Sequence, residues 1–225
     1  MIRCHNIYPT IMIIDIHSHN VSSMHEYKIN SFCMKDKYTV DFISAKHISI
    51  GIHPWYVAAD DIEQQTEWIK HTAINDKRVI AIGECGTDKL CNTDMNIQNE
   101  AFCNCITLSE ELKLPLIIHS VKTSNEIIRL KKNIKPKQAW IIHGFRGKPE
   151  QTIQYIRNGF FLSFGKSYNP ESLKITPQER ILFETDEYTG SIADIITSAA
   201  KTLDISTDKL FDIVSENAKY LFFSR

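Results

Sequence analysis

Short apolar runs alternate with longer helical patterns along this chain of 225 residues, and several of the runs end in a histidine or a carboxylate. Each run has the length of a buried strand, and the stretches between them repeat apolar residues at helical spacing. Alternation of this kind favours βα units that build a mainly parallel sheet. The pattern therefore limits the chain to an α/β fold.

The apolar runs predict eight strands, enough for a TIM-type (β/α)8 barrel. The predicted strands cover Met12 to His17, Tyr27 to Cys33, His47 to His53, Val79 to Glu84, Pro115 to His119, Ala139 to His143, Phe160 to Phe164, and Ile181 to Thr185. Helices are predicted over Asp60 to Asn75, Met95 to Leu112, Pro149 to Asn158, Ser191 to Leu203, and Thr207 to Phe222. The stretch from Met34 to Ser44 is too short for a comfortable helix, so we expect a distorted barrel.

Length and composition fit one globular domain, with 43% apolar and 24% charged residues and no linker. We expect a single barrel over residues 12–225 and an extension outside the core over residues 1–11. No stretch is apolar and long enough to span a membrane, and the first residues do not resemble a secretory signal. The six cysteines contain no C-x-x-C pair, which argues against a structural zinc finger, and we expect them to be reduced thiols of a cytoplasmic protein. The sequence gives no indication of an obligate protein partner.

The charge balance narrows the classes of function. A formal net charge of -1, from 26 basic and 27 acidic residues, excludes a basic protein that coats nucleic acid nonspecifically. It leaves room for a local basic rim, or for metal ions that contact phosphate directly.

The polar residues at the predicted strand ends are the candidate site. They are His17, His19, His53, Glu84, His119, His143 and Asp186. In a parallel barrel the carboxyl ends of the strands meet at one mouth, the face that carries catalytic residues. His17 and His19 form an H-x-H pair that shares one face of its strand. Imidazoles with carboxylates suit zinc or manganese, and carboxylates also admit magnesium, so we expect one or two divalent metal ions.

Each of these residues taken alone has a plainer explanation. A histidine after an apolar strand is more often a polar cap than a ligand, and for His53 alone the cap is favoured. Recurrence at several strand ends is harder to explain in that way, because each unpaired polar group near a core costs roughly 1–3 kcal/mol. A shared metal site accounts for all of them together.

The same segments resemble the TatD family of metal-dependent hydrolases, often described as TatD-like DNases, over about Met12 to Phe222. The matching segments are Ile14-Asp15-Ile16-His17-Ser18-His19, Gly51-Ile52-His53-Pro54, Ala81-Ile82-Gly83-Glu84-Cys85-Gly86, Gln98 to Phe102, Leu114-Pro115-Leu116-Ile117-Ile118-His119-Ser120, His143-Gly144-Phe145-Arg146-Gly147, and Glu184-Thr185-Asp186, with Asn217 and Phe222 in the last helix. The resemblance implies a distorted barrel of the amidohydrolase-like group.

The resemblance also implies two sets of ligands. One metal would be held by His17, His19, Glu84 and Asp186, and the second by Glu84, His119 and His143, with Glu84 bridging. His53 would lie near a substrate phosphate or behind the ligands. Four positions depart from the family pattern: Asn20-Val21, Val121, Gly144 with Arg146, and Glu187-Tyr188. The expected ligands are all present, so these changes bear on substrate choice.

The function expected from the resemblance is hydrolysis of DNA phosphodiester bonds by a metal-activated water. Glu84 and Asp186 are the candidate catalytic residues. Asp186 would orient the water and accept its proton, or act as a plain ligand. Glu184 would support the ligands by hydrogen bonding. Lys122 and Arg146 would bind phosphates, and Trp55, followed by Tyr56, would stack a base.

Two other classes of function stay open. The same site suits hydrolysis of a small ester, lactone or amide, because fold and ligands do not settle which bond is cleaved. A metal-binding or nucleic-acid-binding module without catalysis is the other alternative, and the complete ligand set argues against it. A PHP-type phosphoesterase also begins with H-x-H, but the Gly-Ile-His-Pro and Ile-Gly-Glu segments fit it less well.

Overall fold

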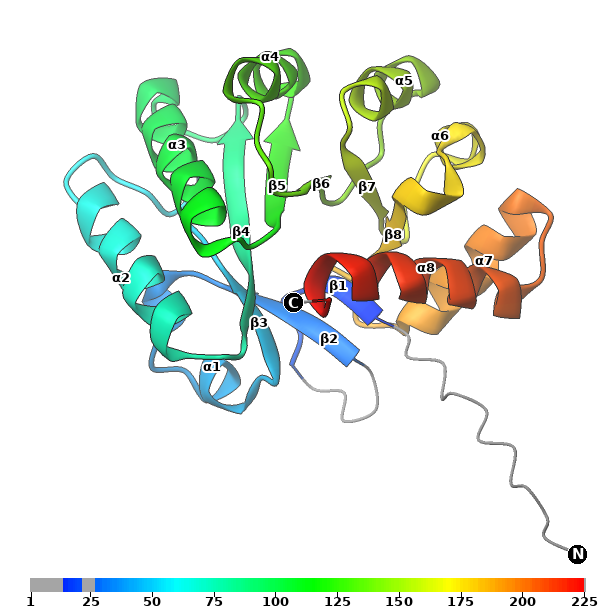
Figure 1. The fold of residues 1–225 in the computed structure, drawn as a ribbon, viewed down its shortest axis with the longest axis horizontal. Helices are drawn as coiled ribbons and strands as arrows, with labels where there is room; N and C mark the ends of the chain where they lie inside the picture. Colours follow the sequence, from blue (N-terminus) through cyan, green and yellow to red (C-terminus); the bar gives the residue numbers. More distant parts are fainter. Residues whose placement is uncertain (1–13, 22–26, 225) are drawn as a thin grey trace, which may run out of the picture.

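The computed structural model describes residues 14–21 and 27–224, and these form an eight-stranded parallel sheet in which neighbours in sequence are neighbours in space. The strands are β1 (Ile14–Ser18), β2 (Tyr27–Phe32), β3 (His47–Ile50), β4 (Val79–Asp88), β5 (Leu116–Val121), β6 (Trp140–Ile142), β7 (Phe161–Phe164) and β8 (Ile181–Phe183). The sheet curls into the predicted TIM-type barrel (Figure 1). The expectations for residues 1–13 lie outside the described residues.

Helices cover the outside of the strands, and α8 lies across one end of the barrel beside β1 and β8 (Figure 1). The helices are α1 (Val40–Ser44), α2 (Ile62–Asn75), α3 (Met95–Leu112), α4 (Ser124–Ile134), α5 (Pro149–Arg157), α6 (Pro170–Ile175), α7 (Ile192–Leu203) and α8 (Thr207–Phe222), with 3-10 turns η1 (Met34–Asp36) and η2 (Gln178–Arg180). Among the described residues, none of these helices combines the length and apolarity needed to cross a membrane.

The helix ends follow the local sequence. The Asp94 carboxylate accepts a hydrogen bond from the backbone of Asn96 at the start of α3, and the Ser206 hydroxyl caps α8 in the same way. The five predicted helices are confirmed, but α1, α4 and α6 were missed. Helix α1 lies in the stretch from Met34 to Ser44 that was expected to be too short for a helix. Helix α4 begins after Thr123 without a side-chain cap and buries Ile127 and Ile128 alone, so its apolar stripe is narrow. Helix α6 has only 6 residues, which is too short for the spacing of apolar residues to reveal a helix.

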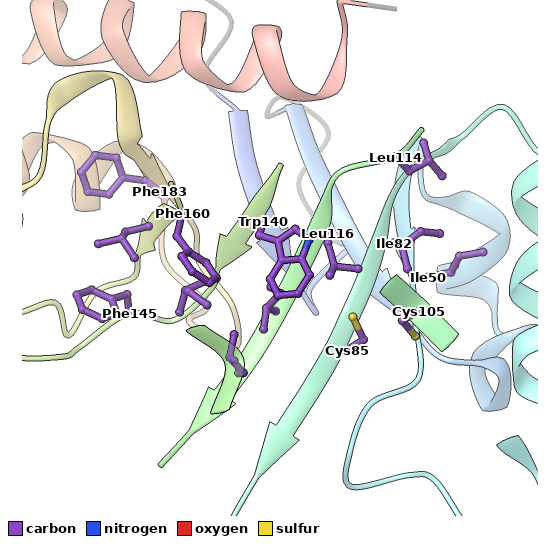
Figure 2. Packing of buried hydrophobic residues seen from close by; sticks show 14 of the residues in the cluster. Ile50, Ile82, Cys85, Cys105, Leu114, Leu116, Trp140, Phe145, Phe160 and Phe183 are labelled. Carbon is purple, nitrogen blue, oxygen red and sulfur yellow. The ribbon is translucent and has the colours of Figure 1, made fainter. Parts of the chain in front are cut away.

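Two apolar layers hold the barrel together. The smaller cluster of buried strand residues fills its interior and consists of Ile14, Ile16, Ile29, Ile80, Ala81, Ile117, Ile141, Phe161 and Leu182. Ala218, Leu221 and Phe222 of α8 join this interior cluster and close one end of the barrel. The larger outer cluster, which includes Leu116, Trp140 and Phe160, packs the strands against the helices (Figure 2). With one end closed by α8, the other end is left for polar residues.

The interior alternation places histidines at the open end. Ile117 and Ile141 point into the barrel, and residues two further along a strand point the same way. His119 and His143 therefore stand directly above this apolar layer. An apolar strand that ends in histidine therefore packs its apolar residues in the core and places the imidazole at the open end of the barrel.

Strands β1 and β8 meet where the polar residues gather. The Asp186 amide donates to the His17 carbonyl over 2.9 Å, and the His19 amide donates to the Asp186 carbonyl over 3.1 Å. Below them, the buried carboxylate of Asp15 accepts hydrogen bonds from the Thr185 amide over 2.9 Å and the Thr185 hydroxyl over 2.6 Å. These bonds join the first and last strands beside the candidate ligands.

Replacing Asp15 should weaken this junction. Asp15→Ala leaves the buried Thr185 amide without its acceptor, and leaves the Thr185 hydroxyl only its 3.0 Å contact with the Ser18 hydroxyl. We therefore expect a loss of about 2 kcal/mol in the free energy of unfolding. Asp15→Asn should lose less, because its amide oxygen still accepts from the Thr185 amide. Urea unfolding followed by circular dichroism measures both. Equal stability of wild type and Asp15→Ala would show that the junction does not depend on this side chain.

Candidate metal centre

The carboxylate of Glu84 lies at the centre of the polar cluster. Its side chain is buried on β4, between the ends of the neighbouring strands. The two carboxylate oxygens face the imidazoles of five histidines, namely His17, His19, His53, His119 and His143. The strand-end residues expected to meet at one mouth are therefore brought together.

One oxygen of Glu84 belongs to a group with the H-x-H pair. The Nε2 atoms of His17 and His19 each lie 3.4 Å from Glu84 Oε2, and each lies 3.7 Å from Asp186 Oδ1. Two ligand atoms that share a tetrahedral cation at about 2.1 Å are separated by about 3.4 Å. These four side chains thus have the spacing of ligands around one ion.

The other oxygen of Glu84 belongs to a second group. Glu84 Oε1 lies 2.7 Å from His119 Nδ1 and 2.7 Å from His143 Nε2, and the two imidazole nitrogens are 3.3 Å apart. The two groups use different oxygens of one carboxylate. This is the arrangement that a bridging carboxylate requires.

The protonation of the cluster also suits a cation. Both ring nitrogens of His17 are buried without a hydrogen-bond partner, and burial lowers the pKa of this imidazole to about 4, so it is neutral. Burial opposes the charge on Glu84, but His143 and the hydrogen bonds from the surrounding imidazoles hold the pKa of Glu84 well below its usual range. The neutral imidazole of His17 beside the ionised carboxylate of Glu84 is the form in which these two groups bind metal. The donor set therefore fits a divalent ion.

His53 contacts Glu84 in a different way. The Trp55 amide donates to His53 Nδ1 over 3.1 Å, so Nδ1 is an acceptor and the proton of the neutral ring is on Nε2. Nε2 lies 3.2 Å from Glu84 Oε1 and can donate to it. A protonated nitrogen cannot coordinate a metal, so this geometry makes His53 a hydrogen-bond donor that holds Glu84.

Glu184 lies directly behind His143. Glu184 Oε1 lies 3.3 Å from His143 Nδ1 and accepts a 2.6 Å hydrogen bond from the Gly144 amide. Burial works against a charge on His143, yet Glu84 and Glu184 raise the pKa of this imidazole well above its usual range. Carboxylates that attract a proton to this position also attract a cation.

Asp88 is a member of the cluster that the sequence analysis missed. Asp88 Oδ2 lies 3.3 Å from His119 Nε2 and accepts a 2.8 Å hydrogen bond from the Trp55 indole. A carboxylate at Nε2 leaves Nδ1 of His119 free to face Glu84. The predicted strand ended at Glu84, whereas β4 continues to Asp88, and residues 84, 86 and 88 share one face. If the predicted strand had been extended to residue 88, Asp88 would have been recognised as a candidate.

The cluster opens into a cavity of about 420 Å³. Of the predicted residues, His19, His53, Trp55, Glu84, His119, His143 and Asp186 line this cavity. His17 and Glu184 lie buried behind it. Lys122 and Arg146 are exposed and are not among the described residues that line it, so the structure does not bring these two expected phosphate contacts to the cavity.

A parallel barrel with a cluster of imidazoles and carboxylates at its open end defines the class of metal-dependent hydrolases. Residues 39–223 match the TatD related DNase family, and the chain belongs to this family. YabD of Bacillus subtilis, called an uncharacterized metal-dependent hydrolase, is 32% identical over 207 residues, which cover 81% of this chain and 78% of YabD.

Two further proteins are similar. The 3′-5′ ssDNA/RNA exonuclease TatD of Erwinia tasmaniensis is 29% identical over 153 residues, which cover 60% of this chain and 56% of that protein. The crystal structure of YjjV, a TatD homologue from Escherichia coli K12, superposes with a TM-score of 0.79 at 17% identity and covers 96% of this chain and 100% of that one. This structural likeness confirms the predicted barrel.

Close backbone contact explains the glycine before His53. A Cβ atom on Gly51 would lie 2.5 Å from the Glu84 carbonyl oxygen and 2.8 Å from the Gly83 Cα. Both neighbours are backbone atoms and cannot rotate away. The end of β3 can therefore approach Glu84 only because residue 51 has no side chain.

Adding a methyl group at Gly51 should displace Glu84. We expect Gly51→Ala to fold less stably by about 1–3 kcal/mol and to bind divalent metal more weakly than wild type. Gly165→Ala is the matched control, because its Cβ would meet nothing closer than 3.8 Å at the same end of the barrel. Manganese titration by calorimetry measures the affinity. Unchanged affinity in Gly51→Ala would mean that Glu84 does not need this contact.

Proposed function

We propose that this protein hydrolyses phosphodiester bonds of DNA with a metal-activated water, as a TatD-like deoxyribonuclease. The supporting observation is the position of Glu84, whose two oxygens face separate groups of ligands. Relatives named for nuclease activity support nucleic acid as the substrate. Two nearby cations suit phosphoryl transfer, because they stabilise both the attacking and the leaving oxygen.

Two ligand sets follow from this geometry. His17, His19, Glu84 and Asp186 would hold one ion, and Glu84, His119 and His143 would hold the other. Magnesium, manganese and zinc all accept this mixture of oxygen and nitrogen ligands. When bound, the ions lower the pKa of a water molecule and polarise the phosphate.

The chain's own residues then position and move the proton. Asp186 is partly exposed to the cavity, with its Oδ1 near both histidines of the H-x-H pair, and we assign it the role of accepting the proton from water. His53 holds Glu84 by donating from Nε2, and Asp88 and Glu184 orient His119 and His143. Lys122 and Arg146 are exposed outside the cavity, where they can contact only more distant parts of a long substrate.

A small ester or lactone is the second candidate substrate. The carboxylates of Asp36, Asp41 and Glu187 also line the cavity, and negative charge at the entrance disfavours a polyanion. Assays of labelled single-stranded DNA and of a panel of small esters, each with and without chelator, separate the two. Hydrolysis of esters without cleavage of DNA would overturn the proposed substrate.

Asp186→Asn should abolish turnover while the metal remains bound. An amide still coordinates through its oxygen but cannot accept a proton, so kcat should fall at least about 10²-fold. Glu84→Ala should lose both turnover and metal, because it removes the shared ligand. Cleavage of a labelled oligonucleotide and metal analysis by mass spectrometry measure the two effects. Normal kcat in Asp186→Asn would disprove the proposed proton transfer.

His53→Ala should affect turnover more than metal content. The substitution removes the donor that holds Glu84 Oε1, and we expect activity to fall about tenfold with metal content close to that of wild type. His53→Gln, which retains an N–H donor, should recover part of the activity. Metal loss as complete as that of Glu84→Ala would instead make His53 a ligand.

A further inference from the structure

Lys35 on η1 is the one lysine or arginine among the described residues that line the cavity. The sequence analysis assigned phosphate binding to Lys122 and Arg146 because they follow strand ends, but neither lines this cavity. A phosphodiester chain that enters it would meet the ammonium of Lys35 in their place.

Lys35 is held in position by an aromatic ring. Its Nζ lies 4.1 Å from the centroid of the Tyr56 ring, within the range of a cation–π interaction. The Tyr56 ring also packs against the His53 ring at 5.2 Å, and His53 Nε2 contacts Glu84. Direct contacts therefore run from Glu84 through His53 and Tyr56 to Lys35, and they hold the ammonium at the wall of the cavity.

Lys35 keeps the capacity to bind an anion. Its Nζ lies 3.5 Å from Asp36 Oδ1, but the lysine side chain is 53% exposed, and an exposed pair of this kind contributes little. The other oxygen of Asp36 accepts a hydrogen bond from the Cys33 amide, which ties this carboxylate to the turn. An ammonium has three N–H donors, and a single contact with Asp36 leaves donors for a phosphate.

An aromatic surface adjoins this cation. The Trp55 side chain is 54% exposed, and its indole N–H is fixed by the 2.8 Å hydrogen bond to Asp88. Its ring packs in T-shaped contacts with the His53 ring at 5.2 Å and the His119 ring at 6.0 Å, and Trp55 lines the cavity. A fixed cation next to a fixed aromatic face is the combination that binds single-stranded nucleic acid.

We infer that Lys35, positioned by Tyr56, binds the phosphate adjacent to the cleaved one in a single strand, and so determines the preference for a polynucleotide over a single phosphodiester. The inference rests on the proposed function and deepens it. Lys35 acts in substrate binding, so its removal raises KM for a strand and leaves the chemistry of the metal centre unchanged.

The test compares Lys35→Ala with a matched control two residues away. Lys37 belongs to the same segment and lies 5.0 Å from the Tyr38 ring, but it does not line the cavity. Each variant is assayed with manganese on a single-stranded oligothymidylate and on a dinucleotide that carries one phosphodiester and no terminal phosphate. Lys35→Arg and Tyr56→Ala test the charge and the ring that holds it.

Lys35→Ala should raise KM for the oligonucleotide about fivefold to tenfold, with unchanged kcat, metal content and dinucleotide KM. The slope of log affinity against log salt should decrease by about 0.7, the value of one phosphate contact on a single strand. Lys35→Arg should retain most of the binding, Tyr56→Ala should lose part of it, and Lys37→Ala should match wild type.

Three outcomes would overturn the inference in distinguishable ways. Equal KM and salt slope for Lys35→Ala and Lys37→Ala would remove Lys35 from the binding site while leaving the nuclease proposal intact. An equal loss on the dinucleotide would place the effect at the metal centre. Wild-type protein that cleaves esters but neither nucleotide substrate would disprove the proposed function and this inference with it.

Discussion

The carboxylate of Glu84 is the group on which the rest of the candidate site depends. A buried carboxylate is expensive unless it is paired, and here the imidazoles of several strand ends supply the partners. Those imidazoles are themselves buried, and the nitrogens of His17 have no hydrogen bond. The arrangement is unfavourable as a purely structural network. It is favourable around cations, which accept lone pairs from every member of the group.

The backbone makes this concentration of polar groups possible. Glu84 can lie between β3 and β5 because Gly51 and Gly86 have no side chains, and a Cβ at either would collide with a neighbouring backbone. On the other side, the hydrogen bonds between residues 17–19 and Asp186 join β1 to β8. The first and last strands of the barrel are therefore joined at the level at which the ligands converge. The same contacts stabilise the barrel and position the candidate site.

The entrance of the cavity combines opposing charges. Asp36, Asp41 and Glu187 would repel a polyanion, while the metal ions and Lys35 would attract it. This balance reconciles a net charge of -1 with the proposed action on nucleic acid. Recognition of a nucleic acid would depend on a few positioned groups near the metals, because the sequence has no excess of basic residues to create a general positive potential.

The sequence by itself determined the barrel and the convergence of its strand ends. Apolar runs of strand length, several of them ending in a histidine or an acid, indicate both the fold class and the side of the barrel that is polar, because alternation along a strand is a local property. The same local rule put His119 and His143 above Ile117 and Ile141.

Only the tertiary structure decided which charged residues face the cavity. Lys122 and Arg146 follow strand ends yet lie outside it, whereas Lys35 comes from a turn with no sequence signal and is held there by Tyr56, twenty-one residues further along. Asp88 reaches His119 because β4 extends beyond Glu84. The direction of a long side chain in a loop is set by packing against residues distant in sequence, so periodicity carries no information about it.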